Sequence, residues 1–263
     1  TNPDSGFIQK NLDRIISWQL KHFCRTANGV SYVTEHTIQN HYPNSAMING
    51  ESEYFFQSYY SSISLGVDAF TGPRDYLNGN NLTLVLSDVS MGSERKGEII
   101  LFKAMKEVAD KGYDVNALII GDGPLKKNFE NAAAELGLGN RVLFTGRLPS
   151  AIQVREAMMN ADMFVFPTTA EGLPRGILEA MAIGMPVLST PVGGIPEGLD
   201  KEYLFSPTDY HGFAAKIEEL IKDRNKLNDM SKKNFEKALE YKSDILQKRR
   251  DEFYKKLRSL TER

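Results

Sequence analysis

Cysteine and tryptophan are scarce in this chain of 263 residues, which contains one residue of each. Cys24 has no cysteine partner within the chain, so an internal disulfide is excluded, and the scarcity of cysteine is typical of a reducing compartment. No apolar run approaches the ~18–20 residues that a membrane-spanning helix needs. Lysine and arginine number 32 against 34 aspartates and glutamates, without a basic tract of the kind that binds nucleic acid. The composition therefore indicates an ordinary soluble globular protein that does not bind nucleic acid.

Motifs for metal binding and for several kinds of catalysis are also missing. The four histidines show no metal-ligand spacing with one another or with Cys24, and the chain has no Asp-X-Asp pair. No Ser/His/Asp or Cys/His set indicates nucleophilic hydrolysis. There is no Walker A motif, and the turn Gly121–Pro124 lacks the third glycine of a dinucleotide-binding fingerprint. We therefore expect no metal ion and no cofactor.

From Leu82 onward, apolar runs alternate regularly with helical patterns. Nearly all-apolar strands separated by helices indicate a parallel sheet covered on both faces. We expect an α/β fold with a Rossmann-like, doubly wound parallel sheet, whose ligand binds at the carboxyl ends of the strands. The expected strands are 82–88, 115–121, 141–146, 163–166, 186–189 and 202–206, and the expected helices are 98–110, 124–136, 149–159 and 174–183.

The first part of the chain is expected to form an appendage to this domain. Residues 5–27 carry apolar residues on one helical face, and Asp4 or Ser5 can cap that helix. A short strand and a short helix follow within 29–42. The stretch 43–81 is rich in Asn, Ser, Gly and Tyr and predicts a linker or an ordered surface excursion.

The stretch 161–197, ADMFVFPTTAEGLPRGILEAMAIGMPVLSTPVGGIPE, predicts a compact βαβ unit that carries two glutamates. A helix N-terminus presents unpaired N–H groups and about half a positive charge, which favours an anion. Gly172 permits a close approach of the backbone, and Pro174 is favourable at a first helical position. Carboxylates accept hydrogen bonds from hydroxyl groups, so Glu171 and Glu179 beside this helix end suggest a ligand with both phosphates and hydroxyls, such as a sugar nucleotide.

Part of this stretch, AEGLPRGILEAMAIGMPVLSTPVGGIPE, resembles the donor-binding signature of the group 1, or family 4, retaining glycosyltransferases with the GT-B fold. Its two glutamates stand eight positions apart, which is the spacing of that family, and the likeness extends over residues 82–206. The resemblance implies an enzyme of polysaccharide biosynthesis that transfers a hexosyl or N-acetylhexosaminyl group from a UDP- or GDP-sugar with retention of configuration. It also implies a metal-independent enzyme, in which lysine, arginine and a helix dipole replace the cation.

The resemblance assigns roles to particular residues. It implies that Glu171 contacts hydroxyls of the transferred sugar and that Glu179 accepts hydrogen bonds from the ribose. Lys96, in the sequence GSERKGE, is expected to hold the donor diphosphate together with backbone N–H groups. The catalytic residues are therefore expected to be Glu171 and Lys96, and the further donor-binding residues Glu179, Gly172, Leu173, Pro174, Arg175, Arg95, Arg147 and Gly146.

One position departs from the family pattern. The family usually has an arginine just after the first strand of this domain, where this chain has Asp88. Either Arg95 takes the place of that arginine, or the charge is absent. In the loop after the third strand, backbone groups at Gly146 and the side chain of Arg147 are expected to contact the nucleotide base. The Gly-Asp-Gly-Pro turn that begins at Gly121 is expected to be architectural.

The resemblance also divides the chain. Residues 1–42 are expected to be the remnant of an N-terminal domain, 43–81 an interdomain linker, 82–208 the Rossmann-like nucleotide-sugar-binding domain, and 209–263 helices that pack on this domain or cross back. The first residues, TNPDSG, look like those of an excised piece of a longer chain. A glycan or lipid-linked acceptor is expected on the missing N-terminal domain, so this piece alone is expected to be inactive. The full-length protein is expected in the cytoplasm, either free or peripheral at the inner face of the membrane.

Two other functions remain open. A UDP-sugar 2-epimerase has a related two-domain fold, but it needs acid/base carboxylates and histidines that cannot be assigned in this sequence. A non-catalytic nucleotide-sugar-binding module would keep the fold and lose the reaction, and the departure at Asp88 favours it. The sequence also leaves open the base, the sugar and the acceptor.

Overall fold

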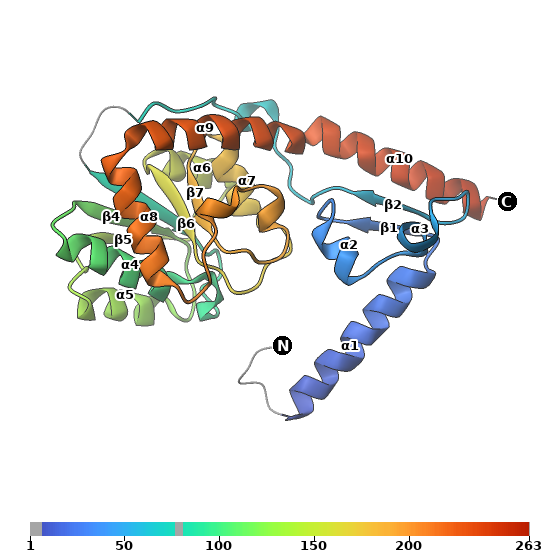
Figure 1. Ribbon diagram of the computed structural model, residues 1–263, viewed down its shortest axis with the longest axis horizontal. Coiled ribbons are helices and arrows are strands. Elements are labelled where there is room, and N and C mark those ends of the chain that lie inside the picture. Colours follow the sequence, from blue (N-terminus) through green and yellow to red (C-terminus); the bar gives the residue numbers. More distant parts are fainter. Residues whose placement is uncertain (1–6, 77–80, 263) are drawn as a thin grey trace. The chain divides into compact units, whose positions relative to one another are not determined.

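The computed structural model describes residues 7–76 and 81–262, which form two compact units (Figure 1). The smaller unit contains the chain up to Ser62 and the chain from Asp244 onward, and the larger unit contains Ile63–Ser243. The segment with alternating strand and helix patterns therefore lies within the larger unit. None of the helices in the described part of the chain is long and apolar enough to cross a membrane.

A five-stranded parallel sheet forms the centre of the larger unit. Its strand order is β5-β4-β3-β6-β7, so the chain starts in the middle and adds strands first to one side and then to the other. This is the predicted doubly wound, Rossmann-like arrangement, and the α/β fold class is confirmed. The strands are β3 (Leu82–Ser87), β4 (Val115–Ile120), β5 (Val142–Gly146), β6 (Met163–Phe166) and β7 (Val187–Ser189).

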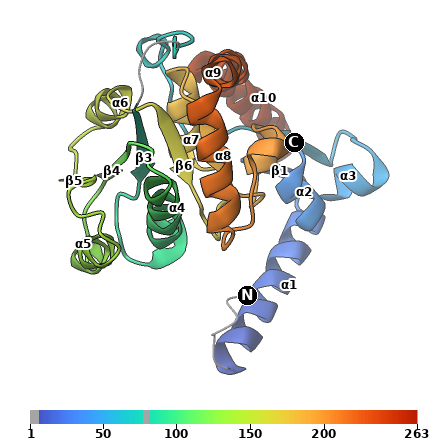
Figure 2. The same ribbon diagram turned by 60° about the vertical axis from the view of Figure 1, so that its left-hand side comes forward.

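Helices cover both faces of this sheet, which explains why its strands are nearly all apolar. Side chains of the central strands, such as those of Leu84, Val85 and Phe164, are fully buried. One face carries α4 (Glu98–Asp110), α5 (Lys126–Glu135) and α8 (Tyr210–Lys222), and the other carries α6 (Ala151–Met159), α7 (Arg175–Ala182) and α9 (Arg224–Ala238) (Figure 2).

The prediction of a sixth strand at 202–206 is wrong. Lys201–Tyr203 form a 3₁₀ turn, η4, and Leu204 makes one isolated bridge to β7. Within this segment Tyr203 is buried, whereas Leu204 and Phe205 are half-buried, and the ring centroids of Phe205 and Phe213 on α8 lie 5.0 Å apart. Apolar residues alone therefore did not distinguish a packed turn from a buried strand.

The smaller unit contains helices around a parallel pair of strands. Strands β1 (Gly29–Tyr32) and β2 (Phe56–Tyr59) pair in register from Gly29 opposite Phe56. The ring of Phe253 packs on that of Phe56, with centroids 5.5 Å apart. The helices are α1 (Phe7–Thr26), α2 (Thr37–His41), α3 (Ser45–Asn49) and α10 (Ser243–Thr261). The expected capping residues of α1, Asp4 and Ser5, lie outside the described residues.

Helix α1 exposes a set of large apolar side chains. Their exposed fractions lie between 45% and 66%, and the residues are Leu12, Ile15, Ile16, Trp18, Leu20 and Phe23. An exposed apolar set of this kind marks an interaction surface in a folded protein.

The stretch 43–81, expected to be an interdomain linker, contains ordered elements in its described part. Besides α3 and β2 it includes a short 3₁₀ helix, η1 (Val67–Ala69). Phe56 and Leu65 are 2% and 1% exposed, so this segment contributes to the cores of the two units. In the larger unit the N–H of Arg74 donates to Ser231 Oγ on α9 at 2.7 Å.

Candidate functional site

A cavity of about 490 Å³ opens at the carboxyl ends of β3 and β6. The strand order reverses between these two strands, which is where doubly wound sheets bind their ligands. Its lining comes from the loops after β3, β5 and β6 and from the first turns of α6 and α7. The lining residues are Ser87, Asp88, Val89, Ser90, Lys96, Leu148, Pro149, Ser150, Ala151, Val154, Phe166, Glu171, Leu173, Pro174, Arg175, Gly176 and Glu179.

The loop after β6 delivers the start of α7 to this cavity. Pro174 precedes the first helical residue, and among the described side chains none caps the helix. Its first backbone N–H groups therefore remain available to a ligand. Gly193 packs closely against this loop. It has a φ of +57°, and a Cβ there would lie 2.0 Å from the carbonyl oxygen of Glu171.

The loop after β3 is locked against the loop after β6. The N–H of Thr169 donates to the carbonyl oxygen of Arg95 at 2.9 Å. Gly97 has a φ of +88°, and a Cβ there would lie 2.4 Å from the carbonyl oxygen of Pro167. Because the glycine permits this approach, Lys96 is held beside the loop that carries Glu171.

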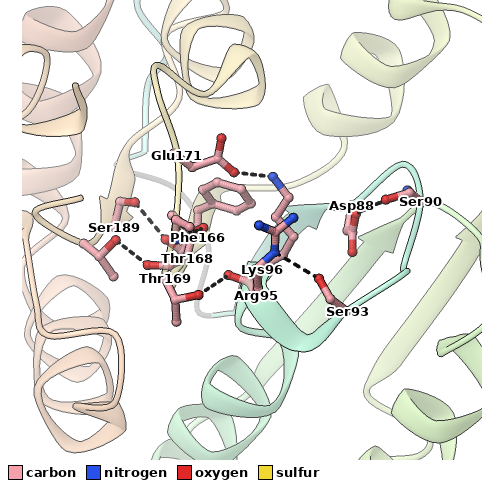
Figure 3. Close-up of polar contacts among 12 residues, drawn as sticks. Asp88, Ser90, Ser93, Arg95, Lys96, Phe166, Thr168, Thr169, Glu171 and Ser189 are labelled. Carbon is pink, nitrogen blue, oxygen red and sulfur yellow. Dashed lines mark hydrogen bonds and ion pairs between the residues drawn. The ribbon is translucent and has the colours of Figure 1, made fainter. Parts of the chain in front are cut away.

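Lys96 and Glu171 form an ion pair in the cavity (Figure 3). The Lys96 Nζ also lies 5.2 Å from the centre of the Phe166 ring, as in a cation–π contact. The side chains are 29% and 14% exposed, so the pair is partly shielded from water. A cation and a hydrogen-bond acceptor thus meet beside the N-terminus of α7.

Glu179 lies on the second turn of α7 and faces the same cavity. Burial raises the pKa of its carboxyl group, while the positive charges of Arg155 and then Arg175 lower it. Arg175 lies on the same helix, and Arg155 lies on the neighbouring helix α6. Two guanidinium groups therefore favour the ionised form of Glu179 against the cost of its burial.

A second pair of carboxyl groups lies beneath the loop after β3. Asp88 is 3% exposed, and its Oδ1 accepts a hydrogen bond from the N–H of Ser90 at 3.2 Å. Glu98, the first residue of α4, is 0% exposed, and neither of its carboxyl oxygens has a hydrogen-bond partner among the described residues. The pKa of Glu98 is raised to about 8, chiefly by burial and to a smaller extent by the nearby Asp88, while the backbone of Glu98 and the charge of Lys96 lower it. Glu98 is therefore protonated at neutral pH.

The structure brings together six of the ten predicted site residues. Lys96, Glu171, Leu173, Pro174, Arg175 and Glu179 all line the cavity. The other four, Gly172, Gly146, Arg95 and Arg147, are not among its lining residues.

The four remaining residues have structural contacts or lie in solvent. The carbonyl of Gly172 accepts from the N–H of Gly194, and that of Gly146 accepts from the N–H of Gly121 at 3.1 Å. Arg95 and Arg147 are exposed, and the Nε of Arg95 donates to Ser93 Oγ at 3.3 Å. No arginine from the described loop after β3 is among the residues that line the cavity.

Sequence reasoning missed the contribution of α6 and of Glu98. Ser150, Ala151 and Val154 on the first turn of α6 line the cavity, and Arg155 follows them with a side chain that is 11% exposed. The sequence offers one signal for this helix end, because Ser150 is a favourable N-cap and its Oγ accepts from the N–H of Gln153. Nothing in the pattern distinguishes Glu98 or Arg155 from a solvated charge on a helix. No group of three or more His, Cys, Asp or Glu side chains in 7–76 and 81–262 could hold a metal ion.

A doubly wound sheet with an uncapped helix end at its switch point defines a Rossmann-like ligand-binding domain. Residues 82–237, more than half of the chain, match the family of group 1 glycosyl transferases, and the chain belongs to this family. This membership favours the transferase interpretation over the epimerase.

Individual relatives agree with the family match. Protein CapJ of Staphylococcus aureus is 29% identical over 191 residues, which are 72% of this chain and 45% of that protein. The 2-deoxystreptamine glucosyltransferase of Streptomyces kanamyceticus is 32% identical over 142 residues, 53% of this chain and 36% of the enzyme. The chain therefore spans less than half the length of these relatives.

Solved structures share the fold. The Anabaena protein HepE, crystallised with UDP and glucose, superposes with a TM-score of 0.70 and 22% identity. The likeness covers 94% of this chain and 67% of that one.

Proposed function

We propose that this chain is the donor-binding half of a retaining glycosyltransferase. The donor is a UDP- or GDP-sugar, and the acceptor is a glycan or a lipid-linked saccharide. The observation that carries this proposal is the meeting of Lys96, Glu171, Glu179 and the uncapped start of α7 in one cavity at the switch point of the sheet. These groups are the chemical complement of a diphosphate that joins two hydroxyl-rich sugars.

The diphosphate binds between the start of α7 and Lys96. Backbone N–H groups of the first turn donate to the phosphate oxygens, and the helix dipole favours their negative charge. Lys96 is paired with Glu171 in the structure. An ammonium group has three donors, so Lys96 can contact a phosphate oxygen while it keeps one hydrogen bond to Glu171.

The two glutamates hold the sugars on either side of the diphosphate. Glu179 accepts hydrogen bonds from the ribose hydroxyls. Burial raises the pKa of its carboxyl group, and the charges of Arg155 and Arg175 oppose that rise. Glu171 accepts hydrogen bonds from the transferred sugar. The backbone carbonyl of Glu171 packs closely against Gly193, where an added Cβ would lie 2.0 Å from the carbonyl oxygen.

In the reaction, the bond between the anomeric carbon of the sugar and the diphosphate oxygen breaks. The electron pair of that bond goes to the leaving nucleoside diphosphate, whose negative charge grows. Lys96 and the N–H groups at the start of α7 stabilise this charge, which is the usual contribution of a preorganised site. No metal ion is required in this scheme, because the cations of the chain occupy its place.

The acceptor binds on another domain of a longer protein. The exposed apolar side chains of α1 support this part of the proposal, because an apolar surface of this kind needs a packing partner. The chain also spans only 45% of protein CapJ. Residues 1–42 are then the end of that other domain, and this chain alone binds donor but transfers little or no sugar.

Calorimetry with UDP, GDP, UDP-glucose and GDP-mannose tests the proposal. We expect one nucleotide series to bind with micromolar to millimolar affinity, and Glu179→Gln to weaken binding about tenfold. Glu156→Gln is the matched control, because Glu156 is exposed and lies outside the cavity lining. If none of the four compounds binds, the proposal is refuted, and robust sugar transfer by this chain alone refutes the division into two halves.

A non-catalytic nucleotide-sugar-binding module is the second candidate. The observation that favours it is the buried Asp88, since no arginine of the described loop after β3 lines the cavity. The longer protein distinguishes the two, because a binding module neither transfers sugar to an acceptor nor hydrolyses the donor slowly in its absence.

A further inference from the structure

The cavity has one wall that carries no charge. This wall comes from the loop after β5 and the first turn of α6, and we call it the α6 wall; its residues are Leu148, Pro149, Ser150, Ala151 and Val154. The charged residues of the lining lie on the loops after β3 and β6 and on α7, and they are Asp88, Lys96, Glu171, Arg175 and Glu179. The two parts of the lining therefore suit different parts of a ligand.

In the proposed function the charged part holds the diphosphate and the two sugars, so the α6 wall is left for the base. A planar base packs its faces on apolar side chains, and its edge needs only a few hydrogen bonds. Leu148 and Val154 are half-buried and offer such apolar surface. Gly146 and Arg147, where the family resemblance places the base, are not among the lining residues, whereas the residues that follow them are.

The hydrogen-bonding groups of the α6 wall are few. Ser150 caps α6, and its Oγ accepts from the N–H of Gln153 at 3.2 Å. Because a hydroxyl group has one donor and two acceptor positions, its proton remains for a ligand. Pro149 has no N–H, and the carbonyl oxygen of Ser150 accepts from the N–H of Val154 at 3.1 Å. The wall thus suits a base whose edge has more acceptors than donors.

The bases differ in this respect. Uracil has two carbonyl oxygens and a single N–H on its edge, whereas guanine and cytosine each carry an amino group. An amino group against this wall would lose water without gaining a side-chain carboxylate or amide as its acceptor, and such an unpaired donor lowers affinity. Uracil loses least, because Ser150 can donate to one of its carbonyl oxygens and a single main-chain carbonyl is enough for its N–H.

We propose that the α6 wall selects uracil, so that the donor is a UDP-sugar, and that Ser150 is a specificity-determining residue whose hydroxyl group donates to a carbonyl oxygen of the base. This inference rests on the proposed function and narrows its donor from two nucleotides to one. It also gives α6 a part in recognition, although that helix lies outside the stretch 161–197.

Replacing Ser150 with aspartate separates capping from base recognition. Aspartate is as good an N-cap as serine, but its ionised side chain accepts hydrogen bonds and donates none. The added charge repels the diphosphate of every nucleotide alike, so it cancels in the ratio of two affinities. Ser150→Thr keeps both the cap and the hydroxyl donor.

The experiment measures the binding of UDP, CDP and GDP by calorimetry at neutral pH. We expect wild type to bind UDP about tenfold more tightly than CDP or GDP. In Ser150→Asp the preference for UDP over CDP should disappear or reverse, because the amino group gains an acceptor and uracil loses a donor. Ser150→Thr should keep the preference of wild type.

Gln153→Glu is the matched control, because it adds a negative charge on the same turn of α6 at an exposed position outside the cavity lining. It should leave the ratio of affinities unchanged. Thermal melting of every variant reports folding, and Ser150→Asn, which also supplies a cap and an acceptor, replaces Ser150→Asp if that variant does not fold.

Two results would overturn the inference. One is a wild type that binds CDP or GDP as tightly as UDP, and the other is an unchanged ratio of UDP to CDP affinity in the aspartate or asparagine variant. Failure of the wild type to bind any of the three nucleotides is a different result, which refutes the proposed function itself.

Discussion

Replacing Glu98 with glutamine should stabilise the larger unit at neutral and alkaline pH. The side chain of Glu98 is fully buried, and its pKa is raised from 4.5 to about 8, chiefly by burial. Below pH 4.5 the carboxyl group is protonated in both the folded and the unfolded chain, so its titration does not change the free energy of unfolding. Between these two pKa values, unfolding releases a proton, so the free energy of unfolding falls as the pH rises. Glutamine has a similar shape and does not titrate.

The size of the effect follows from the two pKa values. Each pH unit in this window lowers the free energy of unfolding of the wild type by about 1.4 kcal/mol, and the full window corresponds to about 5 kcal/mol as an upper value. Comparing about pH 5.5 with about pH 7.5, we expect the advantage of Glu98→Gln over wild type to grow by roughly 3 kcal/mol. The amide can also donate a hydrogen bond toward the carboxylate of Asp88.

Urea unfolding followed by far-UV circular dichroism measures this difference at each pH. Tryptophan fluorescence is unsuitable, because the single tryptophan, Trp18, lies in the smaller unit while Glu98 lies in the larger one. Glu94→Gln removes a carboxyl group from an exposed position four residues earlier and serves as the control. If the stability curves of Glu98→Gln and wild type run parallel from acid to alkaline pH, Glu98 is not held protonated and the reasoning is refuted.

Two further variants test the site and the turn behind it. Lys96→Met should weaken UDP or GDP binding about tenfold and leave binding of the uncharged nucleoside unchanged. The control Lys103→Met, on the exposed face of α4, should change neither affinity. An equal loss of affinity for the nucleoside and the diphosphate would contradict a phosphate contact. Gly193→Ala should destabilise the larger unit by about 2 kcal/mol more than Gly112→Ala. Both glycines have a positive φ, but only a Cβ at 193 meets the carbonyl oxygen of Glu171. Equal melting temperatures of the two variants would show that the backbone around Gly193 can shift to make room for the Cβ.

The fold could be predicted because its pattern is redundant. Five apolar runs became five parallel strands, since a strand buried on both faces needs apolar side chains along its whole length. The prediction of a strand at 202–206 was wrong because a 3₁₀ turn that packs on α8 contains the same apolar residue types. The stretch 43–81 was harder, because the short strand β2 has no repeating pattern and is recognised through its pairing with β1.

The site could be predicted where its residues are local to one motif. Glu171, Pro174 and Glu179 lie on one turn and one helix, so a single stretch of sequence carries their spacing. Arg155 and Glu98 could not be found in this way. Both side chains are buried near a carboxyl group of another element, and the sequence around them does not predict which side of its helix a lone charge will face.

The protonation of Glu98 limits the negative charge around Asp88, the position that departs from the family pattern. An aspartate close to a diphosphate site opposes binding, and a second ionised carboxylate beneath it would oppose binding more strongly. The carboxylate of Asp88 accepts from the N–H of Ser90, and Glu98, with a pKa of about 8, adds no negative charge beside it at neutral pH. In the proposed site, the charge of Lys96 then acts on Glu171 and on a donor phosphate rather than on a buried pair of carboxylates. Above about pH 8 the ionised Glu98 attracts the ammonium group of Lys96. The affinity for a diphosphate should therefore decline there in wild type and stay unchanged in Glu98→Gln. Calorimetric titration of the nucleoside diphosphate across this range measures both profiles, and a wild-type affinity that stays constant through it would separate Glu98 from the donor site.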